Sequence, residues 1–470
     1  MVDGDWIDDP DLVKHEFRSH FADRFQDLGS RRGSLNFLFL NRLSNDQILD
    51  LESSISKDEI RTAVWGCGVD KSPRPDGFTF EFFHPKVVSD YRPISLLGSL
   101  YKVVTKILAT RISLVISDLI SDVQTAFLPN RQILDSPFII TEILARCKLT
   151  KQQAMIFKVD FAKAYDSIRW YFLYDVLISF GFGSKWRSWI RGSLSSGKIS
   201  ILVNGSPTLE FYFHRGLKQG DPLALFLFLL IMESLHLSFS RAVEAGIFTG
   251  FKVDHSITLS HLFYVEDAVF IGEWSHSNLK GIMNILRCFS LLSGMSIKIQ
   301  KSHLLGVGIP DNYVAEAAKS IGCSIMKAPF KYLGFLVGDN MSSIKAWDEA
   351  ISKMKMRLSR WKLNTLSVEG RLTLLKSVLG STPIYNMSIF KVPKSVLILM
   401  ESLRRNFLMA FKTVIERLLG SNGLSSKYGM EYMLENDPWL IRKAPLILRK
   451  WTPDAKIMME DVYPCLGEVA

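Results

Sequence analysis

The stretch Ser260–Gly272, SHLFYVEDAVFIG, decides the fold. It holds two short apolar runs, Leu262–Val265 and Ala268–Ile271, on either side of the adjacent acids Glu266 and Asp267. β-Branched and aromatic residues on both sides predict a strand, a tight turn and a second strand. Two neighbouring anions beside a buried sheet repel each other unless a cation lies between them. The stretch therefore predicts a turn that presents carboxylates to a cation.

A second acidic stretch, Ile156–Phe161, is an apolar run with Asp160 near its end, and a helix is expected to begin within Ala162–Asp166. If Asp160 and the pair Glu266 and Asp267 come from neighbouring strands, three carboxylates converge on a site for two divalent ions. Metals about 3.5–4 Å apart clamp the attacking and leaving oxygens in phosphoryl transfer. Oxygen ligands favour Mg²⁺ or Mn²⁺ over zinc. For any single acid, a helix cap or a surface ion pair is an equally good explanation.

Five segments follow one another along the chain: FKVDFAKAYDSIRW at 157–170, RGLKQGDPL at 215–223, FYVEDAVF at 263–270, GMSIKIQKS at 294–302 and KYLG at 331–334. In their order and spacing they resemble the palm of reverse transcriptases, and in particular the non-LTR (LINE-type) retrotransposon group of plants. The resemblance covers roughly Ile55 to Phe407. One position departs from the family pattern, because the family has Asp where this chain has Glu266, whose carboxylate is one methylene longer.

The resemblance implies an α+β fold, a right-hand polymerase with fingers, a ferredoxin-like palm and a helical thumb. It also implies an RNA-directed DNA polymerase that binds an RNA template, a DNA primer and deoxynucleoside triphosphates. Asp160, Glu266 and Asp267 would hold two Mg²⁺ or Mn²⁺ ions. Lys301, together with Lys298, would contact or protonate the leaving pyrophosphate. An ordinary surface lysine is the alternative for at least one of the two.

Further residues are candidates for nucleotide binding. Tyr165 would exclude a ribose 2′-OH, and an ordinary core aromatic is the alternative. Gln219 and Gly220 lie in a loop before a predicted helix, where glycine permits close backbone approach and a helix start favours phosphate. Lys102 and Arg131 would face the template or the triphosphate, and a solvated helix face is the alternative for each.

Composition gives broader limits. The 470 residues suggest two to four structural units, and 47% hydrophobic with 22% charged residues is typical of a globular protein. A net charge of +10 points to a polyanionic partner. Five scattered cysteines indicate neither a disulfide framework nor a zinc site and fit a reducing compartment, the nucleus or the cytoplasm. The run Leu223–Met232 is too short to span a bilayer, so it predicts a buried helix and no membrane partner.

The expected domains follow the chain in order: an N-terminal segment at 1–54, fingers at 55–150, palm at 151–338, thumb at 339–411, linker at 412–428 and a C-terminal fragment at 429–470. The fingers appear shortened relative to the family near residues 83–84. The turn Lys71–Phe78 has Arg74 where the family has Gly. The C-terminal fragment resembles part of the gag-like domain of plant retrotransposons, expected here as a partial α/β fragment.

Two helices are expected within the fingers. Ser56–Glu59 matches a capping box at the start of the first. The second, Tyr101–Ile116, is amphipathic. Its apolar face should contain Val104, Ile107, Leu108 and Ile112, and its polar face Lys102, Lys106 and Arg111.

The thumb combines an apolar helix face with a strong positive charge. The apolar positions are Ile344, Trp347, Ile351, Met354, Leu358 and Trp361. Residues 351–411 contain eleven Lys and Arg against two Glu. By resemblance, Lys353, Lys355, Arg357 and Arg360 would hold the template–primer duplex through its phosphates. A generic solvated helix face is the alternative.

The leading interpretation is a LINE-type reverse transcriptase that transfers nucleotides to a primer 3′-OH by two-metal catalysis, impaired by Glu266 and the shortened fingers. The alternative is a catalytically inactive, nucleic-acid-binding remnant of a retroelement. No endonuclease or RNase H signature, P-loop or dinucleotide fingerprint is visible in the sequence. Protein partners cannot be inferred from it.

Overall fold

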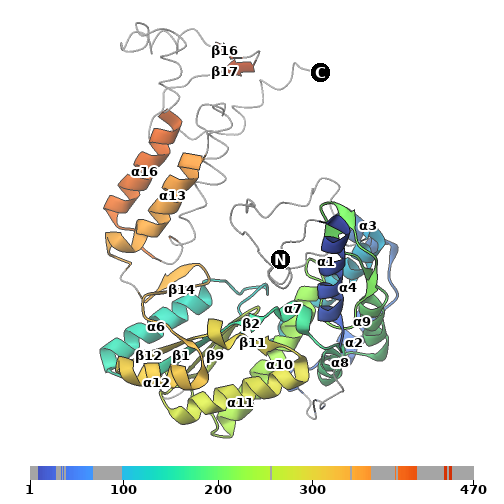
Figure 1. The fold of residues 1–470 in the computed structure, drawn as a ribbon, viewed down its shortest axis with the longest axis horizontal. Coiled ribbons are helices and arrows are strands. Elements are labelled where there is room, and N and C mark those ends of the chain that lie inside the picture. Colours follow the sequence, from blue (N-terminus) through green and yellow to red (C-terminus); the bar gives the residue numbers. More distant parts are fainter. Residues whose placement is uncertain are drawn as a thin grey trace. The chain divides into compact units, whose positions relative to one another are not determined.

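The computed structural model describes residues 9–27, 33, 35, 39–66, 98–254, 257–338, 341–360, 387, 390–409, 439–441 and 444–446. They form a mixed α+β structure, and the chain divides into two compact units, residues 1–339 and 340–470. Figure 1 shows the sheet of the first unit and the paired helices of the second. The Lys71–Phe78 turn, the junction at 83–84, the 412–428 linker and Trp361 lie outside the described residues.

A five-stranded sheet of order β13-β12-β1-β10-β9 forms the centre of the first unit. Central strand β1 (Ala154–Val159) pairs antiparallel with both β10 (Asp267–Gly272) and β12 (His303–Val307). Strand β9 (His261–Tyr264) pairs with β10 across a tight turn, and β13 (Ser324–Ile325) runs parallel to β12. The predicted strand–turn–strand is confirmed, and the two acidic strands are neighbours.

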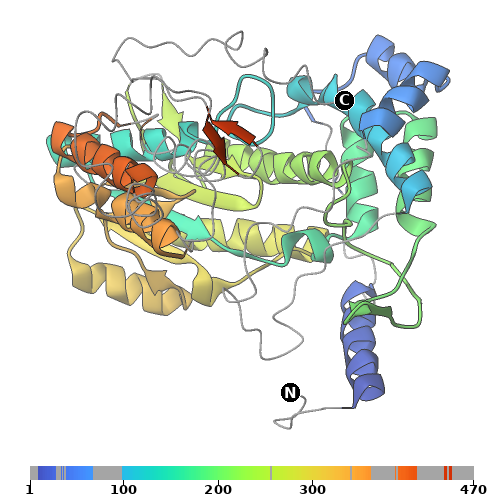
Figure 2. The same cartoon turned by 90° about the horizontal axis from the view of Figure 1, so that it is seen from above.

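Two long helices cover one face of the sheet. Helices α10 (Ala224–Glu244) and α11 (His276–Ser293) pack side by side (Figures 1 and 2). Phe239 of α10 stacks on Phe270 of β10, with ring centroids 4.2 Å apart. Because side chains alternate along a strand, the neighbours of Phe270 point to the other face. Asp267 and the adjacent Asp160 therefore point to that other face.

The other helices in the described part of the first unit are α1 (Pro10–Phe25), α2 (Asn45–Glu52), α3 (Lys57–Gly66), α4 (Ser99–Ser113), α5 (Ile116–Leu119), α6 (Asp135–Thr150), α7 (Ala164–Ser167), α8 (Trp170–Ser179), α9 (Ser184–Ser195), η3 (Ile299–Lys301) and α12 (Asp311–Ile321). It also contains short antiparallel pairs: β2 (Phe161–Ala162) with β11 (Ser296–Ile297), β3 (Lys198–Ile199) with β6 (Phe211–Tyr212), β4 (Leu202–Val203) with β5 (Ser206–Pro207), β7 (Phe251–Lys252) with β8 (Thr258–Leu259), and β14 (Phe330–Tyr332) with β15 (Phe335–Val337).

Helix α10 confirms the buried helix predicted from Leu223–Met232. Among the described residues it is the one helix long and apolar enough to cross a membrane by length and composition. Its apolar window is 61% buried, and Glu233 in its middle is 3% exposed. These are the properties of a core helix.

Helix α4 departs from its expected faces at two positions. Val104 is 43% exposed and Arg111 is 6% exposed, whereas the other three apolar positions are buried as predicted. The Arg111 guanidinium is buried because it donates hydrogen bonds to both carboxylate oxygens of Glu59 and to three backbone carbonyls, those of Leu51, Ser53 and Ser54. These acceptors come from an earlier segment, so periodicity within α4 does not predict them.

The second unit has its own small core. Its described elements are η4 (Ile344–Trp347), α13 (Asp348–Arg360), α16 (Lys394–Met409) and the strand pair β16 (Trp439–Ile441) and β17 (Ala444–Leu446). Trp347, Ile351 and Met354 are buried as predicted. Ile344 is 53% exposed, so its assignment to the apolar face is wrong. It lies in a 3₁₀ turn, whose period of three does not continue the helical face.

The predicted capping box of α3 creates a test of stability. Ser56 N–H donates to Glu59 Oε2, and Glu59 N–H donates to Ser56 Oγ. Hydrogen bonds from Arg111 and Ser56 lower the pKa of Glu59 to about 2. Because the folded-state pKa is lowered, this interaction stabilises the fold at neutral pH and is lost as the pH falls through the range from about 4.5 to about 2.

We expect Glu59→Gln to lower the free energy of unfolding by about 1 kcal/mol near pH 7, because a charge-assisted hydrogen bond is lost. The deficit should shrink as the pH falls below about 4.5, as measured by urea denaturation. The control is Asp58→Asn, since Asp58 pairs with Arg61 on the exposed surface. It should change stability by less than about 0.5 kcal/mol. An equal deficit for Glu59→Gln at all pH values would contradict this assignment.

Candidate active site

The turn between β9 and β10 consists of Val265 and Glu266 and carries backbone strain. Val265 has a φ of +51°, a left-handed conformation that β-branched residues rarely adopt. Asp267 is the first residue of β10 and lies opposite Tyr264, the last residue of β9. Strain of this kind persists only where surrounding contacts hold the chain, and it is frequent at functional sites.

Asp160 follows β1 directly and lies beside Asp267. The β1–β10 register makes these two acids the next residues outward on adjacent strands. The backbone of Asp160 is held on both sides, because its N–H donates to Ser302 Oγ at 3.2 Å and its carbonyl accepts from Lys298 N–H at 2.8 Å. Ser302 is fully buried. The sequence analysis did not identify this serine as a support of the site.

Electrostatics couple the two acids. Burial raises the pKa of Asp267, the charge of Lys158 lowers this pKa, and the charge of Asp160 raises it. The Asp160 and Asp267 carboxylates are thus close enough to repel each other. Among the described residues, no three carboxylate, imidazole or thiol groups gather as a metal site would require. The structure therefore brings Asp160 and Asp267 together, whereas the complete set of three with Glu266 stays a prediction.

A cavity of about 360 Å³ opens beside the acidic turn. Five of the predicted site residues line it: Tyr165, Gln219, Gly220, Glu266 and Asp267. Its other lining residues are Phe127, Asp221, Ala224, Leu225, Tyr264 and Val265. Tertiary structure thus joins four segments that are far apart in the sequence into one wall around a carboxylate pair.

Tyr165 forms part of this wall. Its ring stacks on Phe228 of α10, with centroids 4.4 Å apart and an interplanar angle of 11°. Burial, together with the charge of Glu266, raises the pKa of the Tyr165 hydroxyl, which therefore stays neutral at physiological pH. The ring packs on the core and also faces the cavity. Its predicted role toward a ribose 2′-OH stays a prediction.

Gly216, in the same loop as Gln219 and Gly220, packs against the chain's own backbone. Its φ is +87°, and a Cβ built on it would lie 2.6 Å from the backbone oxygen of Asp166. Gly216 N–H donates to the carbonyl of Ile168, and Gly216 C=O accepts from Trp170 Nε1. This glycine therefore permits close approach to the chain's own backbone. Gly220, with a φ of +97°, is the glycine of this loop that lines the cavity.

The start of α10 is already occupied by a carboxylate. Asp221 Oδ1 accepts from Leu223 N–H at 2.9 Å, and Asp221 Oδ2 accepts from the Tyr101 hydroxyl at 3.1 Å. The ammonium of Lys218 is buried 3.9 Å from the centroid of the Tyr101 ring. Burial lowers the pKa of Lys218 and raises that of Asp221. These contacts hold Asp221 just before the helix, and the expected contact of phosphate with the helix start stays a prediction.

Three basic residues predicted at the site do not line the cavity. Lys102 is half-buried in the first turn of α4, and Lys301 is exposed at the end of η3. The guanidinium of Arg131 donates to three carbonyls of its own loop, those of Ile120, Ser121 and Gln124. The contacts predicted for these residues with nucleic acid, triphosphate or pyrophosphate stay predictions.

The predicted duplex-binding residues lie on α13 in the second unit. Lys353 and Lys355 are exposed, and Lys353 pairs with Glu349 at 3.0 Å. The side chains of Arg357 and Arg360 lie outside the described residues. Their role in holding a duplex stays a prediction.

Phe127 is a cavity residue that the sequence analysis did not single out. It has a φ of +54° and is 62% exposed, and its ring lies 6.0 Å from that of Tyr264. Exposure and a left-handed backbone are decided by tertiary contacts, so no signal in the sequence identified this ring.

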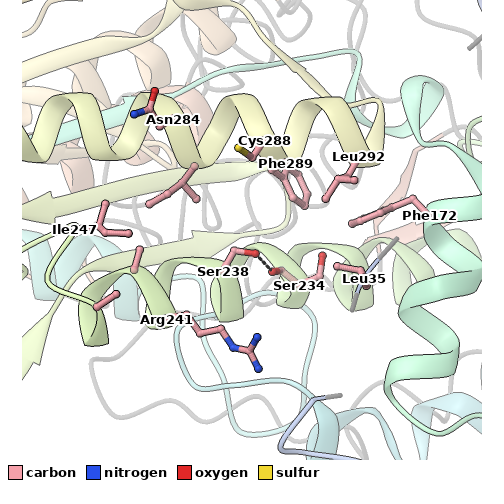
Figure 3. Close-up of a pocket in the computed structure, with 13 residues that line it drawn as sticks. Leu35, Phe172, Ser234, Ser238, Arg241, Ile247, Asn284, Cys288, Phe289 and Leu292 are labelled. Carbon is pink, nitrogen blue, oxygen red and sulfur yellow. Dashed lines mark hydrogen bonds between the residues drawn. The ribbon is translucent and has the colours of Figure 1, made fainter. Parts of the chain in front are cut away.

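A larger cavity of about 510 Å³ lies between α10 and α11 (Figure 3). Its wall is mostly apolar, and the labelled side chains include Phe172, Ile247 and Leu292. Its polar members are Ser234, Ser238, Arg241 and Asn284. None of the predicted site residues lines it. The smaller cavity is therefore the candidate active site.

The family comparison agrees with this geometry. The family model described as "Reverse transcriptase (RNA-dependent DNA polymerase)" matches residues 84–337, more than half of the chain. The chain belongs to the reverse transcriptase family. Both acidic strands and every residue that lines the smaller cavity lie within the matched residues.

The curated relatives place this reverse transcriptase among those of non-LTR retrotransposons. It is 24% identical over 431 residues to the Transposon TX1 uncharacterized 149 kDa protein of Xenopus laevis, covering 82% of this chain and 32% of the relative. It is 28% identical over 273 residues to the Pol polyprotein of retrotransposable element R2DM of Drosophila melanogaster, covering 57% of this chain and 24% of the relative. The chain thus spans about a third or less of the length of these proteins.

Among solved structures, apo telomerase from Candida tropicalis is similar at a TM-score of 0.37 and 12% identity, with 69% of this chain and 60% of that chain covered.

The conformation of Gly216 leads to a test of the reverse transcriptase fold. Gly216→Ala should destabilise the protein by at least about 3 kcal/mol, because the left-handed backbone disfavours a Cβ and the Asp166 carbonyl must move. The control is Gly205→Ala, since Gly205 has a φ of +80° and nothing within 4 Å of an added Cβ. It should cost about 1 kcal/mol. Equal losses in urea denaturation would contradict the close approach at Gly216.

Proposed function

We propose that this reverse transcriptase domain performs RNA-directed DNA synthesis. The observation that carries the proposal is the placement of Asp160 and Asp267 on adjacent strands beside the cavity that also holds Tyr165, Gln219 and Gly220. In the reaction, the primer 3′-oxygen bonds to the α-phosphorus of a deoxynucleoside triphosphate, and pyrophosphate leaves. The substrates are therefore an RNA template, a DNA primer and deoxynucleoside triphosphates.

The donor chemistry fits divalent metal ions. Asp160 and Asp267 offer hard carboxylate oxygens, and their mutual repulsion favours a cation between them. With Glu266, they are the residues of this chain that would hold two Mg²⁺ or Mn²⁺ ions. When bound, such ions stabilise negative charge on the attacking and leaving oxygens.

The chain's own residues position the substrate. Tyr165, supported from behind by Phe228, forms a rigid wall where a ribose would lie. Gln219 offers an amide to the nucleotide, and Gly220 leaves space for close approach of the backbone. The basic residues of the second unit, including Lys353 and Lys355, hold the duplex through its phosphates.

A catalytically inactive, nucleic-acid-binding remnant is the second candidate, and Glu266 favours it. A carboxylate moved outward by one methylene is displaced by about 1 Å, which at a reacting centre can cost roughly 10²-fold in rate. Primer extension on an RNA template separates the two candidates.

We expect Asp160→Asn to abolish nucleotide incorporation, because the site loses one of its two adjacent carboxylates. Primer–template binding, measured by fluorescence anisotropy, should be unchanged within about twofold. Asp46→Asn, at an exposed position of α2, is the matched control and should retain full activity. Unchanged extension by Asp160→Asn would exclude this carboxylate from catalysis.

The departure at Glu266 has its own test. We expect Glu266→Asp to raise any measurable rate of incorporation by at least about tenfold, or roughly 1.4 kcal/mol of transition-state stabilisation. Glu244→Asp, at the exposed end of α10, serves as control and should leave the rate unchanged. An unchanged or lower rate in Glu266→Asp would mean that the site is adapted to glutamate. If neither the parent protein nor Glu266→Asp incorporates nucleotides while both still bind primer–template, the inactive remnant is favoured.

A further inference from the structure

A glutamine from the fingers reaches the strained turn of the candidate site. Gln124 lies in the loop between α5 and α6 and is 1% exposed. Its side-chain Oε1 accepts hydrogen bonds from Val265 N–H at 3.0 Å and from Ala126 N–H at 3.2 Å. The first of these bonds ends on the residue directly before Glu266. Gln124 therefore connects the fingers loop to the acidic turn.

The same loop also pairs with the edge of the sheet. Gln124 forms a parallel bridge with Phe263 of β9. Phe263 N–H donates to Val123 C=O at 2.8 Å, and Thr125 N–H donates to Phe263 C=O at 3.0 Å. Three residues of the loop thus contact the strand that leads into the turn, so Gln124 approaches Val265 from a fixed direction.

Two charged side chains, partly buried Arg131 and buried Glu233, hold this loop in place. Arg131 Nη1 donates to the carbonyl of Gln124 at 2.7 Å, and Arg131 Nη2 donates to that of Ile120 at 2.8 Å. Glu233 of α10 accepts from both the N–H and the hydroxyl of Ser121, at 3.1 and 2.9 Å. The loop that contains Gln124 is therefore held by hydrogen bonds within the loop and by hydrogen bonds to helix α10.

The amide of Gln124 is costly to bury. Its Nε2 has no hydrogen-bond partner among the described residues, and such a buried donor is unfavourable for folding. An apolar side chain of the same length would fill the space without that cost. The two hydrogen bonds that Oε1 accepts compensate for this cost. One of them comes from the N–H of Val265, the left-handed residue of the acidic turn.

We propose that Gln124 is a positioning residue that holds Val265 in its left-handed conformation and so places Glu266 and Asp267 for metal binding. This inference rests on the proposed function. Gln124 itself does not line the cavity and acts through the backbone of the turn. The role predicts that loss of Oε1 weakens metal binding without unfolding the protein.

The test uses the full chain and Mn²⁺ alone, with binding measured by electron paramagnetic resonance. Gln124→Met removes both Oε1 bonds and the unpaired donor at nearly constant side-chain volume. We expect its Mn²⁺ dissociation constant to rise by about tenfold, the lower end of the effect of removing an outer-shell partner. Its urea unfolding midpoint should be equal to that of the parent protein or higher. Gln153→Met, at an exposed site, is the control and should bind Mn²⁺ as the parent does.

A second variant tests whether Gln124 acts through the conformation of Val265. Glycine adopts a positive φ without strain, so Val265→Gly should make the turn less dependent on Gln124. In that background, Gln124→Met should change the Mn²⁺ dissociation constant by less than about threefold. The difference from the effect of about tenfold in the parent protein would show that the two residues are energetically coupled. An equal tenfold effect in both backgrounds would contradict action through this residue.

The remaining outcomes are also decisive. Unchanged Mn²⁺ affinity in a folded Gln124→Met protein would overturn the positioning role, and so would failure of that variant to fold. Asp160→Asn separates these results from failure of the proposed function. If the parent protein and Asp160→Asn bind Mn²⁺ equally, the assignment of the metal site is wrong. The positioning role of Gln124 is then also wrong.

Discussion

The antiparallel pairing of β1 with β10 is the interaction on which the candidate site depends. It places Asp160 and Asp267 at the same end of two adjacent strands. Because side chains alternate along a strand, a slip of one residue would turn Asp267 toward the core and Phe270 away from it. Packing of Phe270 on Phe239 of α10 opposes that slip. The hydrophobic face thus fixes the register, and the register fixes the acids on the opposite face.

The acids lie in an environment that does not favour two negative charges. Burial and repulsion from Asp160 raise the pKa of Asp267, and Lys158 compensates only in part. Lys158 also lies 5.6 Å from the ring centroid of Tyr332, within the KYLG segment. A site of this kind gains from binding cations, which explains in physical terms why adjacent acids persist in a buried sheet.

Buried or partly buried basic side chains of the first unit contact the chain's own backbone and aromatic rings. Arg111 and Arg131 each donate to three carbonyls of turns and loops, and Lys218 lies against the Tyr101 ring. An arginine has several donors in a rigid fork, so it can satisfy carbonyls that no strand or helix pairs. The loop held by Arg131 includes Gln124, whose side chain accepts a hydrogen bond from Val265 N–H in the strained turn.

The sequence by itself determined the strand–turn–strand around Glu266, the acidic end of β1 and the helix α10. Apolar runs of these lengths and periods are compatible with few structures other than buried strands and helices. It also identified five residues that line one cavity. Only the tertiary structure decided that Arg111 is buried, that Val104 and Ile344 are exposed, and that Gly216 meets the backbone. These outcomes depend on partners distant in the chain, and local periodicity contains no information about such partners.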